Sequence, residues 1–212
     1  MPVNELASSL LARLPWIQHG FGTRHFEVLP EDFAGLKQIH SNLVLVVDRK
    51  GMCGQGDALV TNVSGLTIAV RTADCYPILL ADTRHRAAAA VHAGWRGTIT
   101  HIVEQAIEKM RTEFGTLPAD VHAAIGPGIG ACCYEVGEEV ASQFGYCGRA
   151  HLDLARENRR QLVSAGVEPQ NIEALGVCTF CDAERFFSYR REKEKAGRMT
   201  SYIEIGAEIK PR

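Results

Sequence analysis

Two short apolar runs, at residues 78–81 and 87–91, stand out in the hydrophobic pattern, with the polar sequence DTRHR between them. Short apolar runs bounded by turn residues are typical of buried strands, although periodicity alone does not exclude a helix. We predict a hairpin with Cys75 just before its first strand and His92 at the end of its second. A two-stranded ribbon brings these two ends together, so the pattern places a thiol beside an imidazole.

The rest of the chain alternates further strands with a few helices. Apolar residues three and four apart predict a helix from Thr98 to Phe114, with Gly115 where it should stop. We predict other helices at residues 138–144 and 154–165, and a short one spanning Leu6 to Leu14 that ends before Pro15. Predicted strands cover residues 43–47, 58–61, 67–70, 121–125, 172–177 and 201–205, with a connector at 27–36 and a glycine-rich turn at 51–57. Without a linker or repeat, these elements predict one mixed domain over residues 1–212.

Composition removes several classes of function. The chain of 212 residues has a net charge of −2, and its basic residues cluster only near Arg190 to Arg198, so we expect no nucleic-acid partner. No apolar stretch approaches the roughly 18 residues of a membrane span, and the N-terminus does not resemble a signal peptide. Seven cysteines, an odd number, then indicate reduced thiols in a cytoplasmic protein.

His40, Cys75 and His92 are the candidate metal ligands, because each lies in a turn or small-residue context beside a predicted strand. Two imidazoles and a thiolate would leave zinc an open fourth position, as catalysis requires. The spacing matches no short zinc-finger motif, and a buried thiol with hydrogen-bonded core histidines fits the same residues. None of the eight histidines forms a His-x-His pair, which disfavours chemistry that needs several copper ions.

Other segments carry weaker signals. The sequence HAGWRGT could bind an anion through Arg96 and the backbone of Gly97 and Thr98, or Thr98 could simply cap the following helix. The sequence GPGIG lacks the phosphate-loop lysine, so we expect no nucleotide cofactor there. Adjacent Cys132 and Cys133 are not expected to share one zinc ion. The C-x-x-C pair Cys178 and Cys181 has no second pair at zinc-ribbon distance, which leaves it a minor redox or structural-zinc alternative.

Six segments taken together resemble the laccase-domain family, which was first called polyphenol oxidase and is now described as purine nucleoside phosphorylase. The likeness runs in order from about Gly20 to the C-terminus, and the segments are KQIHS, GDALVT, RTADCYPILL, AAVHAGWRGT, AIGPGIGACCYEVG and FFSYRREKEKAGRM. The resemblance implies a single α+β domain, with a mixed β-sandwich core flanked by helices. It also implies a zinc ion held by His40, Cys75 and His92.

The same resemblance implies the substrates. Family activities are phosphorolysis of adenosine, inosine, guanosine and methylthioadenosine, and deamination of adenosine. A zinc ion would lower the pKa of a bound water toward about 7 for attack on the purine ring. Phosphate then needs cationic partners, for which the candidates are the Arg96–Thr98 turn, Arg24, Arg71, Arg190 and Arg198. Asp74 is a candidate acid, base or supporting carboxylate.

One departure and several alternatives stay open. Only twelve residues separate Arg24 from Lys37, so a helix that carries an active-site arginine in relatives has no counterpart, and the pocket should be more open. The main alternative is a metal-free cysteine hydrolase acting on a peptidoglycan precursor, with Cys75 as nucleophile and His92 as base. Copper-dependent phenol oxidation and a non-catalytic binding role are the others. The sequence does not determine the oligomeric state.

Overall fold

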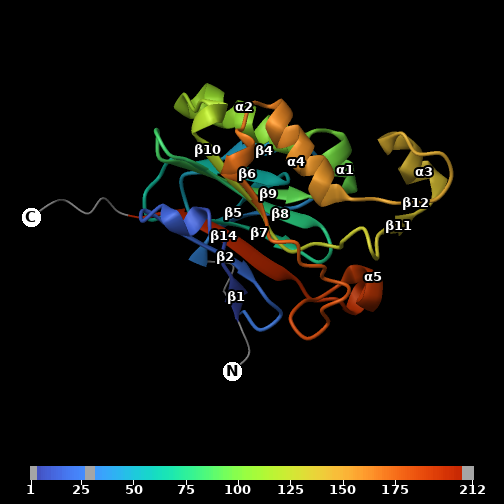
Figure 1. The fold of residues 1–212 in the computed structure, drawn as a ribbon. Coiled ribbons are helices and arrows are strands. Elements are labelled where there is room, and N and C mark those ends of the chain that lie inside the picture. Colours follow the sequence, from blue (N-terminus) through green and yellow to red (C-terminus); the bar gives the residue numbers. More distant parts are fainter. Residues whose placement is uncertain (1–3, 27–31, 207–212) are drawn as a thin grey trace, which may run out of the picture.

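Two six-stranded sheets packed face to face form the frame of the molecule (Figure 1). The computed structural model describes residues 4–26 and 32–206. The first sheet has the order β1 (Glu5–Leu6), β2 (Ile17–Gly22), β14 (Met199–Ile205), β7 (Thr67–Thr72), β3 (Ala34–Lys37) and β5 (Gly51–Gln55). The second has the order β13 (Ile172–Ala174), β10 (Val121–Ile125), β8 (Tyr76–Asp82), β9 (Ala87–Ala93), β6 (Ala58–Thr61) and β4 (Val44–Val46). Parallel and antiparallel pairs occur in both sheets.

Two of the helices below, α2 and α4, cover the outer face of the second sheet (Figure 1). The α-helices are α1 (Trp95–Ile99), α2 (Ile102–Phe114), α3 (Glu138–Ala141), α4 (Leu154–Ser164) and α5 (Tyr189–Glu192). Short 3-10 turns lie at η1 (Leu11–Arg13), η3 (Pro118–Asp120), η4 (Ser142–Phe144), η5 (Pro169–Asn171) and η6 (Lys193–Lys195), and β11 (Glu135–Val136) pairs with β12 (Ala150–His151). The predicted α+β fold with a β-sandwich core is therefore confirmed. No helix among the described residues is both long and apolar enough to cross a membrane.

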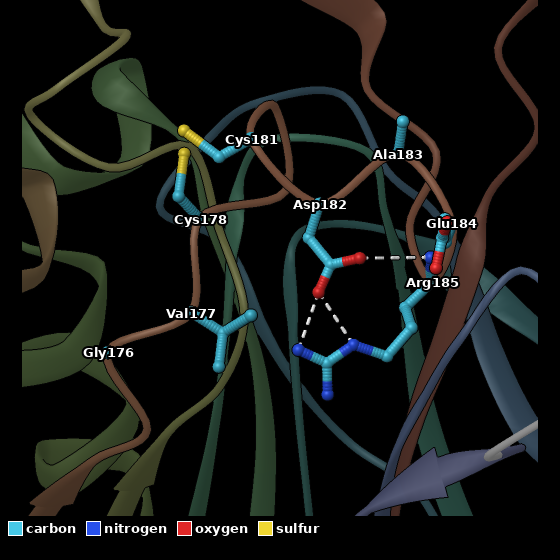
Figure 2. A pocket seen from close by; sticks show the side chains of 8 residues that line it. All are labelled: Gly176, Val177, Cys178, Cys181, Asp182, Ala183, Glu184 and Arg185. Atoms are coloured by element: carbon cyan, nitrogen blue, oxygen red, sulfur yellow. Dashed lines mark hydrogen bonds and ion pairs between the residues drawn. The ribbon is translucent and has the colours of Figure 1, made fainter.

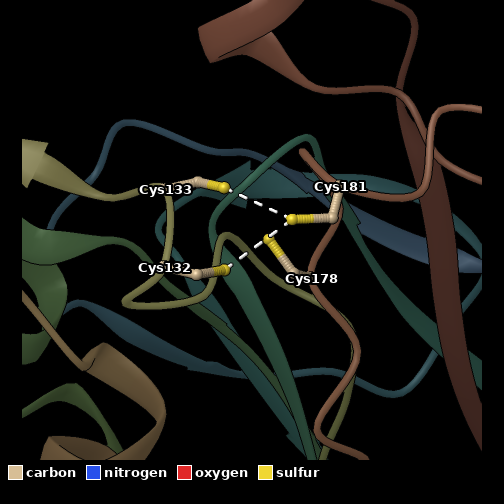
Figure 3. A group of neighbouring side chains, drawn as sticks. All are labelled: Cys132, Cys133, Cys178 and Cys181. Carbon is tan, nitrogen blue, oxygen red and sulfur yellow. Dashed lines mark hydrogen bonds between the residues drawn. The ribbon is translucent and has the colours of Figure 1, made fainter.

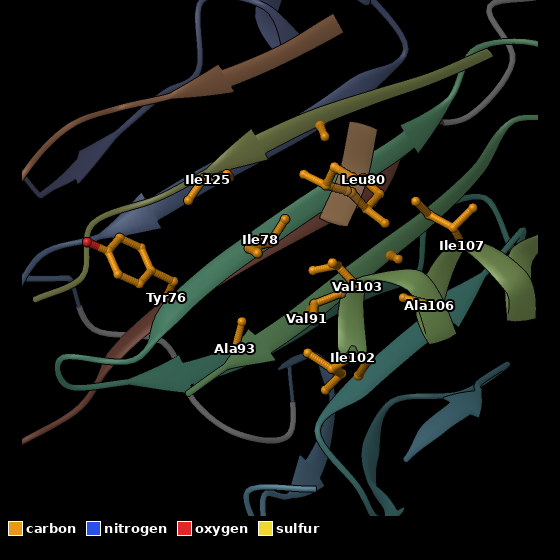
Figure 4. Packing of buried hydrophobic residues seen from close by; sticks show 14 of the residues in the cluster. Tyr76, Ile78, Leu80, Val91, Ala93, Ile102, Val103, Ala106, Ile107 and Ile125 are labelled. Atoms are coloured by element: carbon orange, nitrogen blue, oxygen red, sulfur yellow. The ribbon is translucent and has the colours of Figure 1, made fainter. Parts of the chain in front are cut away.

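The central hairpin explains why two apolar runs lack a polar face. Strands β8 and β9 pair antiparallel, with Tyr76 opposite Ala93 and Pro77 opposite His92, and every residue in both strands is buried. Alternate side chains point to opposite faces of the hairpin. Leu79 and Ala81 pack between the sheets, whereas Ile78 and Leu80 lie in the cluster that includes helix α2 (Figure 4). The predicted hairpin is confirmed.

The predicted long helix is divided in two. Helix α1 begins at Trp95 and ends at Ile99, and α2 begins at Ile102 after His101 adopts a left-handed conformation, with φ 61°. The apolar periodicity survives this break because Ile102, Val103, Ala106 and Ile107 still face the sheet (Figure 4). Gly115 ends α2 with φ 75°, as predicted.

Three predictions about glycine-rich or leucine-rich segments were wrong. The glycine-rich turn at 51–57 contains edge strand β5, and the connector at 27–36 contains the start of strand β3; residues 27–31 lie outside the described chain. Instead of a helix from Leu6 to Leu14, the chain forms strand β1 and the single turn η1. In each case pairing with a neighbouring strand outweighs local propensity.

Candidate metal centre

Three loops that connect the first sheet to the second lie together at one end of the sandwich. Strands β3, β5 and β7 of the first sheet belong to one parallel set, with β3 pairing with both others, so their carboxyl ends lie at the same edge. Each is followed by a crossing into the second sheet, and these crossings carry His40, Asp57 and Cys75 respectively. His92 on β9 lies beside them because its backbone N–H donates to the Asp57 carbonyl at 2.7 Å.

The three predicted ligands converge at this end. His40, Cys75 and His92 each offer one nitrogen or sulfur atom, and these atoms lie within 4.8 Å of one another. The two imidazole rings pack edge to face with their centroids 4.9 Å apart. His92 is buried, Cys75 is half-buried and His40 is exposed, so the group is closed on the protein side and open on the other. That these residues bind a metal remains a prediction.

Asp57 is a buried carboxylate that organises the group. Its Oδ1 accepts from the backbone N–H of His40 at 3.0 Å and from Nδ1 of His92 at 2.8 Å. Its Oδ2 accepts from the N–H of Ser41 at 2.6 Å, from the Ser41 hydroxyl at 2.7 Å and from the N–H of Ile39 at 3.3 Å. Burial alone would raise the pKa of this carboxyl, but the hydrogen bonds from His92 and Ser41 lower it to about 2.

The bond to Asp57 also decides which ring atom His92 presents. With Nδ1 held by the carboxylate, Nε2 is the ring nitrogen left for an ion, an arrangement that orients metal-binding histidines in many proteins. The role of Asp57 is not evident from the sequence, although the residue lies in the GDALVT segment. A single aspartate before an apolar strand carries no distinctive spacing, so its role becomes visible only when His40 and His92 are placed around it.

The thiol of Cys75 and the imidazole of His92 shift each other's pKa in opposite directions. Burial would raise the pKa of Cys75, but the adjacent His92 and His40 lower it to about 6. Burial would likewise lower the pKa of His92, whereas the Cys75 thiolate and Asp57 raise it to about 9. The thiolate is the form of cysteine that binds a metal or acts as a nucleophile, so the site favours the reactive form near neutral pH.

The backbone allows the donors to approach closely. A Cβ at Gly94 would lie 2.8 Å from Sγ of Cys75 and 3.4 Å from Cδ2 of His40, so only glycine fits there. His40 and Asp74 both adopt left-handed conformations, with φ 59° and 81°, which cost energy for residues with side chains and are often retained at functional sites. Two imidazoles, a thiolate and a supporting carboxylate therefore fit a borderline-soft divalent ion.

A cleft of about 720 Å³ opens in front of these donors. Besides the three ligands, its wall includes Trp95, Tyr134 and Tyr189, which provide aromatic surface. Five cationic side chains line it: Arg71, Arg96, Arg190, Lys193 and Arg198. No ion pair to a carboxylate involves any of the five within residues 4–26 and 32–206. A volume of this size suits a small ligand, and the cations favour an anionic one.

Four of the predicted substrate residues line the cleft, namely Arg71, Arg96, Arg190 and Arg198, and three do not. Arg24 instead donates to the Ala183 carbonyl at 2.5 Å and stacks over the ring of Phe187. Gly97 lies against the Ser41 carbonyl, and Thr98 is buried.

The proposed capping role of Thr98 is wrong, because α1 starts earlier in the chain. Gly94 is the N-cap of this helix, and the Thr98 N–H already donates to the Gly94 carbonyl at 2.8 Å. The Thr98 hydroxyl accepts from the side chain of Asn158 on α4 at 2.9 Å. Thr98 therefore packs α1 against α4, and its backbone N–H is not available to an anion.

Asp74 lines the cleft, but both of its carboxylate oxygens are occupied. Oδ1 accepts from the Thr179 hydroxyl at 2.7 Å, and Oδ2 accepts from the Ser188 hydroxyl at 3.1 Å and the Arg190 N–H at 2.6 Å. These bonds join the Cys75 turn to two segments more than a hundred residues away. The carboxylate therefore fixes the wall of the cleft and the start of α5.

The chain is similar in sequence and in fold to proteins of one family. A family model described as "Multi-copper polyphenol oxidoreductase laccase" matches residues 22–206. A purine nucleoside phosphorylase from Deinococcus radiodurans is 44% identical over 184 residues, covering 82% of this chain and 70% of that protein. The adenosine deaminase RL5, from an unknown prokaryotic organism, is 36% identical, covering 79% and 73%. The crystal structure of YlmD from Geobacillus stearothermophilus superposes with a TM-score of 0.88 at 25% identity, covering 98% of each chain.

Replacing Asp57 tests its role in orienting the ligands. We expect Asp57→Asn to weaken metal binding by about 10- to 100-fold, as loss of supporting carboxylates does elsewhere. Chelator competition measures this change. Asp82→Asn is the matched control, since Asp82 is equally buried and bonds His85 at the far end of the same hairpin. Both variants should lose about 1–3 kcal/mol of stability; equal metal affinities in the two variants would contradict the assignment.

Acid titration tests the charge on Asp57. A carboxyl whose folded pKa lies below its unfolded value of 3.8 stabilises the fold above that value, and the contribution is lost as pH falls toward about 2. The unfolding free energy of the wild type minus that of Asp57→Asn should therefore shrink by about 1 kcal/mol between pH 5 and pH 3. Urea denaturation at the two pH values measures it, and a constant difference would show that folding does not lower the pKa of Asp57.

Proposed function

Because the chain belongs to the family described as multi-copper polyphenol oxidoreductase laccase, we propose that it is a zinc-dependent purine nucleoside phosphorylase that also deaminates adenosine. The expected substrates are adenosine, inosine, guanosine and methylthioadenosine, with phosphate as the acceptor. The observation that carries the proposal is the convergence of His40, Cys75 and His92 on a basic cleft with aromatic walls. The names of the relatives suggest the reaction class, and the geometry of the cleft supports this location for the site.

The proposed zinc ligands are His40, Cys75 and His92, with Asp57 holding the second imidazole. When bound, zinc supplies a Lewis acid and lowers the pKa of a coordinated water toward about 7. The protein's part is to orient the donors and to favour the thiolate of Cys75. Asp57 stabilises the ring of His92, and Gly94 leaves room for the thiolate. The exposed face of His40 leaves one side of the site open to substrate.

The cationic residues of the cleft would bind phosphate. Phosphorolysis joins a phosphate oxygen to C1′ of the ribose, while the C1′–N9 bond breaks and the purine leaves with a proton. Arg71 is exposed at the cleft, and its backbone is fixed by two hydrogen bonds with the Gln38 side chain, each 2.8 Å long. Arg190 is anchored by the Glu135 carbonyl at 2.9 Å, and Arg96 lies over the Trp95 ring. Held guanidinium groups favour bidentate binding of phosphate.

Aromatic residues would position the purine. Trp95, Tyr134 and Tyr189 lie on the same cleft and offer flat apolar faces for a base. Burial and the nearby Cys75 thiolate raise the pKa of Tyr134 to about 12, so its phenol stays protonated and can donate a hydrogen bond to substrate. Asp74 is better assigned to positioning than to proton transfer, because both of its oxygens are occupied.

A metal-free cysteine hydrolase is the second candidate, because Cys75, His92 and Asp57 are arranged in the order thiol, imidazole, carboxylate. Its difficulty is His40, a second imidazole beside the thiol that such a triad does not use. Metal analysis of protein purified without added metal separates the two. One zinc per chain in the cleft favours the phosphorylase, whereas alkylation of Cys75 in a metal-free, active protein favours the hydrolase.

Copper remains an alternative ion, since two imidazoles and a thiolate also suit it. The described residues hold only two groups with three or more potential His, Cys, Asp or Glu ligands, and one of these contains no histidine. Copper chemistry with several imidazole-rich sites is therefore disfavoured. All seven cysteines are free thiols, which suits the reducing cytoplasm that we propose as the location.

Removing a ligand should remove both activities at once. His40→Ala and Cys75→Ser should each lose the cleft zinc, together with phosphorolysis of inosine and deamination of adenosine. His85→Ala is the matched control, since His85 is exposed at the opposite end of the hairpin. Product chromatography and metal analysis give the readouts. Retained turnover in either ligand variant would reject the mechanism.

Phosphate binding can be separated from nucleoside binding. Arg71→Ala should raise KM for phosphate by about tenfold or more, the value of a charge-assisted hydrogen bond. Deamination uses water, so its kcat/KM should change little. Arg84→Ala, on the exposed hairpin turn, serves as the control. Equal losses in both reactions would show that Arg71 acts on the nucleoside or on the fold.

A further inference from the structure

Four cysteines form a second sulfur cluster outside the cleft. Cys132 and Cys133 lie on the loop between β10 and β11, and Cys178 and Cys181 lie on the loop after β13 (Figure 3). All four Sγ atoms lie within 4.8 Å of one another. Cys132 and Cys133 therefore lie in the same group of sulfurs, although adjacent cysteines are not expected to share one ion. A tight turn, in which the N–H groups of Cys133 and Tyr134 both donate to the Gly130 carbonyl, accommodates both thiols on one side.

The spacing of the sulfurs suits a single tetrahedral ion. Zinc binds thiolates at about 2.3 Å, so two sulfurs of a tetrahedral site lie about 3.8 Å apart. Sγ of Cys181 lies 3.7 Å from that of Cys132 and 3.3 Å from that of Cys133, with no disulfide among these residues. In an iron–sulfur cluster the thiolates bind different iron atoms and stand farther apart. Four sulfur donors in tetrahedral geometry select zinc among the common divalent ions.

We propose that Cys132, Cys133, Cys178 and Cys181 bind one zinc ion, in a structural site separate from the cleft. Four protein ligands leave no open coordination position, which is the mark of a structural site. The backbone supports the sulfurs, since the N–H of Gly130 donates to Sγ of Cys178 at 3.2 Å. Cys132 and Cys181 are exposed, so the ion would lie near the surface, within reach of chelators.

The ion would join two loops that build the wall of the cleft. Backbone hydrogen bonds already connect Gly128 with Val177 and Thr179, at 3.2 and 3.0 Å. Thr179 in turn donates to Asp74, and the N–H of Ile129 donates to the Asp74 carbonyl at 2.8 Å. The four thiolates would therefore fix the loops that position Ile129 and Tyr134 at the cleft.

The segment that follows the C-x-x-C pair is folded back on itself (Figure 2). The Asp182 carboxylate accepts from the Arg185 backbone N–H at 3.1 Å and from its Nε at 2.6 Å. A hollow lined by Gly176 to Cys178 and by Cys181 to Arg185 separates the two arms. Because this turn is closed by its own ion pair, removing the metal should loosen the cysteine loops without unfolding the sandwich.

Metal counting in cysteine variants tests the proposal. Cys75→Ser protein, purified under reducing conditions without added metal, should retain one zinc per chain. Combining it with Cys181→Ser should remove that ion, and combining it with Cys147→Ser should not, since Cys147 is an exposed free thiol outside both groups. Equal zinc content in the two double variants would overturn the proposal. The result does not depend on the proposed function, because Cys75 is already replaced.

X-ray absorption at the zinc edge provides a second test that requires no change in the cluster. Cys75→Ser protein should show a shell of four sulfur atoms at about 2.3 Å and no nitrogen neighbours. A shell containing nitrogen or oxygen, an iron signal, or a Cys133–Cys181 disulfide found by mass spectrometry would each overturn the proposal. Chelator treatment should also lower the melting temperature of this variant, and an unchanged temperature would contradict a structural role.

Discussion

The site depends on the hydrogen bonds that the buried carboxylate of Asp57 accepts. Its two oxygens accept hydrogen bonds from the loop that carries His40 and from the ring of His92, which lie in different parts of the sequence. Such a group cannot stay buried and charged unless its acceptor positions are filled. The carboxylate and the loop therefore stabilise each other. The carboxylate holds the loop in the strained conformation of His40, and the loop keeps the carboxylate ionised.

Strand topology supplies the rest of the arrangement. The carboxyl ends of β3, β5 and β7 meet at one edge, and the chain crosses to the second sheet after each of them. Loops at one end of a rigid frame are free to carry chemistry, while the strands beneath them carry the packing. This explains why three residues separated by 35 and 17 positions lie within 4.8 Å of one another. It also explains why β8 and β9, buried on both faces, contribute little polar chemistry except at their ends.

The hairpin and the nearness of Cys75 and His92 could be predicted, because apolar runs and a polar turn determine both. Strands β3 and β5 could not, since glycine-rich segments acquire strand structure only from pairing with neighbours. Two other features could not be predicted from the sequence for a related reason: the role of Asp57 and the cluster of Cys132, Cys133, Cys178 and Cys181. Their partners lie on other loops, and no local spacing shows which loops meet. The family resemblance, in contrast, depended on motifs that remain visible along the chain, and the comparisons confirm it.

The two sulfur-containing groups differ in whether they would leave a coordination position of a bound metal ion open. His40, Cys75 and His92 offer three donors facing a cleft, whereas the four cysteines offer a complete set. Anomalous diffraction at the zinc edge, from crystals of protein purified without added metal, tests the central claim most directly. We expect a peak within bonding distance of both imidazoles and of the Cys75 sulfur, with its fourth side toward the cleft. No peak there, or a peak that persists at an energy just below the zinc edge as copper would give, would contradict it.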